Sequence, residues 1–250
     1  MLKKINIIKI TCAITLSPLL FPLILKGDVY IKRVKHYDPV SIIGHTEPAK
    51  DEEGGTWISK DKYRVDDGEK STVIIRLDQR KAYIINHQTK TYSEADIPVD
   101  LKKILCPQAT KFIENLVVSS HVSDTGEMKK IKKWKCKKYV IEIDASVMGI
   151  EVIVNQELWV SKKFAVRMNL YKKFEGELLG LNPLVITCLE EMKKIEGYPV
   201  LIKSSVKMIG AEKNSIEEVI SVEKKSPPPG IYDLPQGYTK SGYNPFPLEK

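Results

Sequence analysis

Short apolar runs separated by polar turns fill the chain between residues 28 and 92. Runs rich in β-branched and aromatic residues predict strands, and turn residues interrupt them about every ten positions, the spacing of an antiparallel sheet. In the run 73–77, apolar residues lie on both faces, so we expect one face to be covered and the other to be partly wet. The strands predicted in this part are 28–36, 56–59, 63–65, 73–77 and 83–85, with a tight hairpin at the Asp-Asp-Gly turn 66–68.

The hydrophobic period changes further along the chain. Between 98 and 116, apolar residues recur at helical spacings, and Pro107 predicts a break or kink in that helical section. Strand patterns return from 116 to about 160. A second helical section follows up to about residue 195, and strand patterns close the series at 199–210 and 215–225. The predicted order is therefore strands, short helix, strands, longer helices and strands.

The strand that contains Trp134 predicts an irregularity. Trp134 and Cys136 share one parity along the strand, whereas Tyr139, Ile141 and Ile143 share the other. A bulge or break near 137–138 would reconcile the two apolar sets.

The apolar stripes of the second helical section have two interpretations. In the first, they line a cavity for an acyl chain, and in the second they are plain core against the sheet, which is the commoner case. A curved antiparallel sheet covered by amphipathic helices often leaves an apolar mouth, and this favours the first interpretation. The candidate lining residues are Met168, Tyr171, Phe174, Leu178, Val185, Leu189 and Met192.

The first 27 residues have the layout of a secretory signal. A basic segment precedes the apolar run 10–25, which Pro18 and Pro22 interrupt and which is shorter than a membrane-spanning helix. We expect cleavage before Asp28 and export to the periplasm or the cell envelope. Because 25–27 is a poor small-x-small cleavage site, an uncleaved anchor stays the alternative.

The net charge of +8 belongs in large part to this signal. Four lysines and no acid lie in residues 1–27, which leaves 36 basic and 32 acidic residues, or +4, for the remainder. A mildly basic chain of this kind gives no electrostatic reason to expect nucleic-acid binding.

The densest local charge lies in MKKIKKWKCKK, residues 128–138. One interpretation is a docking patch for anionic lipid head groups or for an acidic envelope partner. The other is a solvated hairpin whose lysines discourage edge-to-edge pairing, and the interleaved Ile131, Trp134 and Cys136 favour this one. The docking candidates are Lys129, Lys130, Lys132, Lys133 and Lys135.

Catalytic motifs are missing from the sequence. It contains no motif for a serine nucleophile, a zinc protease, a phosphate-binding loop or a dinucleotide site. The histidines are scattered, and no two of them have the spacing of metal ligands. We therefore predict a protein that is not an enzyme and that uses neither a metal nor a cofactor. The histidines are His36, His45, His87 and His121.

Three cysteines follow the signal, namely Cys106, Cys136 and Cys188. Cys106 and Cys188 belong to the two helical sections, and they would be close enough for a disulfide if both sections cover the same mouth. Cys136 would then be a buried, reduced thiol. The alternative is three reduced, packed cysteines, because pairing cannot be deduced from sequence.

Several segments in order resemble a bacterial family of unknown function allied to the LolA/LolB lipoprotein-carrier superfamily. The segments are DVYIK after the signal, WISKDKYRVDDGEKSTVIIRLDQRKAYIINHQTKTYSE, TGEMKKIKKWKCKKYVIEI, ELWVSK and PPGIYDLPQGYTK. The resemblance covers 28–240 and implies an α+β fold, an open antiparallel half-barrel whose concave face is covered by helices. It also implies one such domain over 28–240, followed by an irregular tail at 241–250.

The resemblance implies an exported, non-enzymatic binder of a lipid, a lipidated molecule or another hydrophobic ligand, held between sheet and helices. The alternative is a periplasmic interaction or sensor protein with a closed core and no ligand. Its first candidate contact would be the basic segment 129–138, facing an envelope protein or a membrane surface.

Overall fold

The computed structural model describes residues 27–42, 45–147, 149–164, 166, 168–180 and 188–243. Apart from Gly27, the expected signal lies outside these residues. Within them, twelve strands form one sheet, and β2 (Val40–Ile42) and β3 (His45–Glu47) form a separate small hairpin. In order across the sheet, the strands are β14 (Thr239–Lys240), β8 (Thr91–Asp96), β7 (Lys81–Asn86), β6 (Ser71–Arg76), β5 (Lys62–Asp67), β4 (Lys50–Ile58), β1 (Asp28–Tyr37), β13 (Ala211–Lys225), β12 (Tyr198–Met208), β11 (Ile150–Ser161), β10 (Trp134–Val147) and β9 (Leu116–Ile131).

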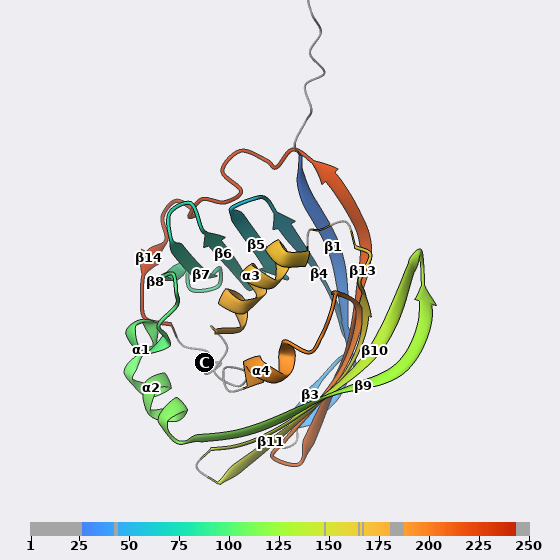
Figure 1. Ribbon diagram of the computed structural model, residues 1–250. Helices are drawn as coiled ribbons and strands as arrows, with labels where there is room; N and C mark the ends of the chain where they lie inside the picture. The colour runs from blue at the N-terminus through green and yellow to red at the C-terminus, as the bar shows by residue number, and fades with distance from the viewer. Residues whose placement is uncertain are drawn as a thin grey trace, which may run out of the picture.

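Strand β1 joins two antiparallel meanders into this single sheet. It pairs with β4 on one side and with β13 on the other, so β4–β8 and β9–β13 become one surface. The short β14–β8 pair is parallel, and every other pair of the sheet is antiparallel. Figure 1 shows the sheet curving around the helices without closing on itself.

The helices lie in the two sections of the chain where the apolar residues recur at helical spacing. The first section forms α1 (Leu101–Ile104) and α2 (Pro107–Glu114), which are separated at Pro107 because a proline cannot continue the preceding helix. The second section contains α3 (Met168–Gly180) and α4 (Leu189–Met192). Figure 1 shows α3 and α4 on the concave side, and α1 and α2 beside the gap between β8 and β9. The fold is α+β, an open antiparallel half-barrel with helices on its concave face, as predicted.

The concave face carries the main apolar core. The strand register places Tyr63, Ile75, Ala82 and Ala95 in one row across β5, β6, β7 and β8. All four are buried in the same cluster as Phe174 of α3. Small side chains at the β7 and β8 end of this row leave room for the helices that cover it.

The convex face of the first meander is covered by the C-terminal segment 227–240, which Figure 1 shows running outside β7 and β8. Trp57, Ile74 and Ile85 pack there against Tyr232. The segment is largely irregular, yet it supplies a second apolar layer. Both faces of β6 are therefore covered, which corrects the expectation of one partly wet face on the run 73–77.

Strand β10 contains the irregularity that its parity pattern predicts. The β9–β10 register shifts between Lys137 and Tyr139, and both apolar sets are buried on either side of the shift. Trp134 and Cys136 join the main core, whereas Ile141 belongs to a second cluster that includes Cys188. No helix in the described part of the chain is long and apolar enough to span a membrane.

Gly197, between α4 and β12, provides a test of this packing. Its φ is +136°, and an added Cβ would lie 2.6 Å from the Ser161 carbonyl oxygen. Gly210, at φ +73°, has no atom within 4 Å of the same position and serves as the matched control. We expect Gly197→Ala to lower the free energy of unfolding by about 3 kcal/mol and Gly210→Ala by about 1 kcal/mol, measured by urea unfolding. Equal losses would contradict the close β11–β12 approach.

Candidate functional site

Helix α3 covers the concave face through two aromatic side chains. Tyr171 is 6% exposed and Phe174 is fully buried. Phe174 stacks on Tyr63 of β5, with ring centroids 5.0 Å apart and planes 18° apart. Lys172 and Lys173 on the same helix are exposed. This amphipathic helix therefore fills the centre of the half-barrel with apolar atoms and presents its cations to solvent.

An aromatic series continues from α3 to the second meander. The Tyr171 and Tyr198 rings are 4.7 Å apart, and Tyr198 stacks on Phe164 at 4.2 Å. Phe164 in turn lies 5.5 Å from Trp134 at the start of β10. Offset and tilted ring pairs of this kind stabilise beyond their buried area, so α3 is held from both halves of the sheet.

The residues predicted to line a cavity occupy two places instead of one. Tyr171, Phe174 and the half-buried Leu178 belong to the main core under α3. Met192 of α4 packs against the second cluster, with Val122, Tyr139 and Ile141, and Leu189 is half-buried on the same helix. Met168 begins α3, but its side chain is outside the description, as is all of Val185. The two stripes therefore contact different parts of the sheet.

A charged group that the residue pattern did not reveal lies beside α3. Arg33 of β1 donates to Glu217 of β13 at 2.9 Å and to the Thr56 hydroxyl at 2.5 Å. Its side chain is 19% exposed. Burial opposes the charged form, but Tyr198 and Glu217 outweigh burial and raise the pKa of the Arg33 guanidinium. Arg33 therefore remains a cation on the apolar side of the sheet.

A cleft opens next to Arg33 at the Leu178 end of α3, and we call it the α3 cleft. Lys35 is the second cation that lines this cleft. Burial opposes the charged form of its ammonium group, but a hydrogen bond with Tyr37 and the nearby Glu217 outweigh burial and raise the pKa of Lys35. Apolar side chains and charged groups thus share one opening, a combination suited to an amphiphile. The lining residues are Arg33, Lys35, Glu52, Gly54, Val65, Asp66, Asp67, Gly68, Ser71, Val73, Leu178 and Glu217.

Helix α3 also carries a half-buried carboxyl group, that of Glu175. Glu175 accepts a hydrogen bond from the Tyr171 hydroxyl at 3.1 Å. Burial raises the pKa of the Glu175 carboxyl, and the Tyr171 hydrogen bond and Lys172 offset this only in part. The docked position of α3 thus holds an acid that would ionise more readily in water.

A second polar network lies on the convex face and anchors the C-terminal segment. Arg64 donates to Asp66 and, at 2.7 Å, to the Ile231 carbonyl oxygen. The buried Thr72 hydroxyl donates to Asp66 at 2.6 Å, and the His87 ring lies between that hydroxyl (2.8 Å) and the Tyr238 hydroxyl (2.9 Å). Every member of this network has a structural partner, so we assign it to the attachment of segment 227–240.

The lysines predicted to form a docking patch lie away from α3. Lys129, Lys130, Lys132, Lys133 and Lys135 are exposed on the β9–β10 hairpin. Among the described residues, no group of three or more His, Cys, Asp or Glu is arranged to hold a metal ion.

The Cys106–Cys188 disulfide is wrong for this structure, because neither cysteine is cross-linked. Cys106 lies by α1, where its backbone N–H donates to the Tyr243 carbonyl oxygen, whereas Cys188 is buried in the second cluster. The two helical sections therefore bring their cysteines to different places.

The fold and site define a class of protein, an open antiparallel half-barrel with a helix seated on its concave face and a charged cleft beside that helix. The chain belongs to the DUF4412 family, a domain of unknown function, whose family model matches residues 47–238. No curated protein matches the chain.

One solved structure with some similarity is a crystal structure provisionally described as an outer membrane lipoprotein-sorting protein domain from Vibrio parahaemolyticus. It is 6% identical, with a TM-score of 0.23, and the match covers 83% of this chain and 89% of that chain. The strand order and register, rather than this match, define the fold of the chain.

Glu175 gives the site a pH dependence with a defined sign. Because its pKa is higher in the folded protein than in the unfolded chain, ionising it costs stability as the pH rises through the folded value. We expect Glu175→Gln to unfold at a higher temperature than the unmodified protein at neutral pH, and this difference to vanish below the ordinary carboxyl pKa of about 4.3. The measurement is thermal unfolding as a function of pH.

The control for this test is Glu177→Gln, which removes the same charge from a half-buried position on the same helix. This variant should not show the pH-dependent rise in unfolding temperature that is expected for Glu175→Gln. A Glu175→Gln variant that is less stable at neutral pH would show that the carboxylate is needed in its charged form.

Proposed function

We propose that this protein is an exported, non-enzymatic binder of an amphiphile, a lipid or a lipidated molecule, between its sheet and its helices. The observation that carries the proposal is that one amphipathic helix, α3, covers the apolar concave face next to a cleft containing Arg33 and Lys35. An acyl chain that displaces α3 would contact the same apolar side chains, and a polar head group would meet the charged lining of the cleft, which holds both cations and carboxylates. The resemblance of the sequence to a family of unknown function allied to the LolA/LolB carrier superfamily supports the same proposal.

The place of action that we propose is the periplasm or the cell envelope. The basic and apolar pattern of the first 27 residues supports export. A ligand that is insoluble in water needs a carrier in an aqueous compartment, and an apolar surface with its own helical cover is suited to that task.

The competing candidate is an interaction or sensor protein whose core is permanently closed. The close stacking of Phe174 on Tyr63, with both side chains buried, favours it. The two candidates differ in one respect: a ligand binder must release α3, and a closed core must not.

Uptake of a fluorescent fatty acid by the delipidated full chain tests the proposal. We expect stoichiometric uptake by the unmodified protein, because the ligand replaces α3 on the concave face. We also expect Phe174→Ala to bind the probe about tenfold more tightly, since truncating the stacked ring weakens the helix that competes with it.

The matched control is Ile141→Ala, which truncates a side chain that is 1% exposed in the second cluster, away from α3. It should lower the unfolding temperature without tightening uptake. If neither the unmodified protein nor the Phe174→Ala variant takes up the probe while both remain folded, the closed-core candidate is correct.

A further inference from the structure

The β9–β10 hairpin has two faces of opposite character. Between Asp124 and Lys138 the sequence holds seven lysines and two acids. On one face, Ile131, Trp134 and Cys136 are buried in the main core. Most of the lysines therefore lie on the outer side of the hairpin or in its turn, whereas Lys129 lies opposite Cys136 at the border of the core face.

The available acids neutralise only part of this charge. Lys137 pairs with Asp124, Lys138 lies 3.5 Å from Glu127, and Lys132 lies 3.2 Å from Glu218 of β13. No ion pair in the described part of the chain involves the other four lysines. Two of them lie over tryptophan rings, Lys129 at 5.5 Å from the Trp159 centroid and Lys133 at 5.2 Å from that of Trp134. The four are Lys129, Lys130, Lys133 and Lys135, all exposed.

Two of these lysines repel each other. The register places Lys130 of β9 directly opposite Lys135 of β10. Like charges at directly opposed positions destabilise a strand pair. Protection of a sheet edge requires charges on the edge strand β9, whereas Lys135 belongs to the second strand. Edge protection therefore does not account for the pair.

The outer face also carries an apolar side chain. Met128 is 50% exposed and shares the face of Lys130, two residues along β9. All the cations are lysines, which act as point charges, whereas arginine is the residue that forms paired hydrogen bonds with individual carboxylates. Point charges around an exposed thioether match a surface of diffuse negative charge that covers an apolar layer, which is an anionic bilayer.

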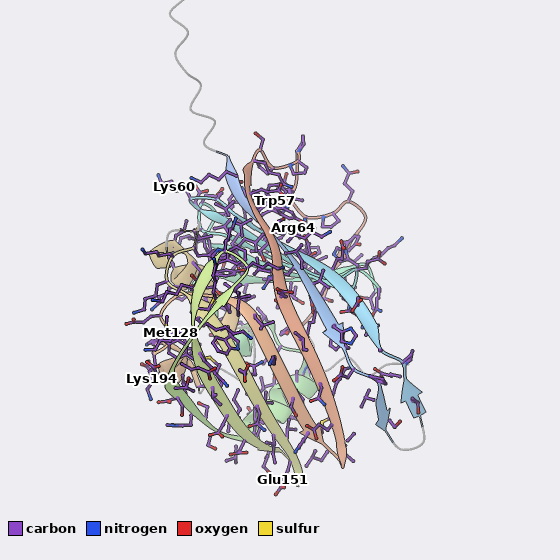
Figure 2. All side chains as sticks on the ribbon, turned by 90° about the vertical axis from the view of Figure 1, so that its right-hand side faces the viewer. Trp57, Lys60, Arg64, Met128, Glu151 and Lys194 are labelled. Carbon is purple, nitrogen blue, oxygen red and sulfur yellow. The ribbon has the colours of Figure 1, made fainter. Side chains whose placement is uncertain are left out.

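We propose that the outer face of the β9–β10 hairpin, formed by Met128, Lys130 and Lys135 with Lys133 at its turn, docks the protein on anionic lipid head groups of a membrane. The hairpin lies outside the α3 cleft, so this surface does not depend on the ligand proposed above. Figure 2 shows Met128 on the side of the molecule, whereas Lys60 lies toward the end where β1 begins. An acidic protein fits less well, because arginine is the residue that pairs with individual carboxylates, and every cation of this surface is a lysine.

The test is sedimentation of the full chain with vesicles of phosphatidylcholine, with and without phosphatidylglycerol. We expect binding that requires phosphatidylglycerol and falls as salt is raised. Neutral vesicles report any binding through the apolar residues 10–25. Lys130→Gln with Lys135→Gln should weaken binding to anionic vesicles about thirtyfold, since each lysine near such a surface contributes about 1 kcal/mol.

The control pair is Lys60→Gln with Lys111→Gln, which removes the same charge from exposed positions elsewhere. It should weaken binding by less than about threefold, as expected for long-range charge alone. The hairpin variant should also unfold at the same or a higher temperature, because it relieves the cross-strand repulsion. That result separates docking from a role in folding.

Three outcomes would overturn the proposal. One is no binding of the unmodified protein to anionic vesicles above the neutral ones. Another is equal weakening by the two pairs of substitutions. The third is tighter binding to soluble polyglutamate than to vesicles of the same charge concentration, which would assign the hairpin to an acidic protein partner.

Discussion

The burial of α3 on the concave face is the interaction on which the rest of the structure depends. An open half-barrel exposes a broad apolar surface, and water makes that exposure unfavourable. Tyr171 and Phe174 remove the centre of this surface from water, and Phe174 does so by stacking on Tyr63. On the opposite face of the same strands, the C-terminal segment removes apolar side chains from water through the packing of Tyr232. The first meander is thus a sheet between two covers of different origin.

The two covers differ in how completely their polar groups are satisfied. The C-terminal segment is attached by Arg64, which donates to a carbonyl oxygen that would otherwise lose its water. Helix α3, in contrast, lies beside the charged Arg33–Glu217 pair and carries Glu175, whose ionised form is disfavoured there. Covering charged groups offsets part of the gain from burying aromatic rings. This balance makes α3 the more suitable cover to move for a ligand, and the C-terminal segment the more suitable one to stay.

The sequence predicts local features well, because they are encoded in the period of the apolar residues. The meanders and the irregularity after Lys137 are of this kind, and the break at Pro107 follows from the proline itself. Arg33 was not predicted. It has the same parity as Val29 and Ile31 on β1, so a cation among inward-facing apolar residues could have revealed it. The Cys106–Cys188 pairing failed because it required knowing which part of the sheet each helix covers. Long-range placement of that kind leaves no trace in the spacing of residues.

Native mass spectrometry of the full chain purified from the cell that produces it tests the central claim most directly. Gentle ionisation preserves a non-covalent ligand that occupies the apolar concave face in place of α3. We predict a population of protein with the added mass of one amphiphile, which is lost when the chain is unfolded. Only the bare polypeptide mass, across all gentle conditions, would contradict a ligand site beneath α3.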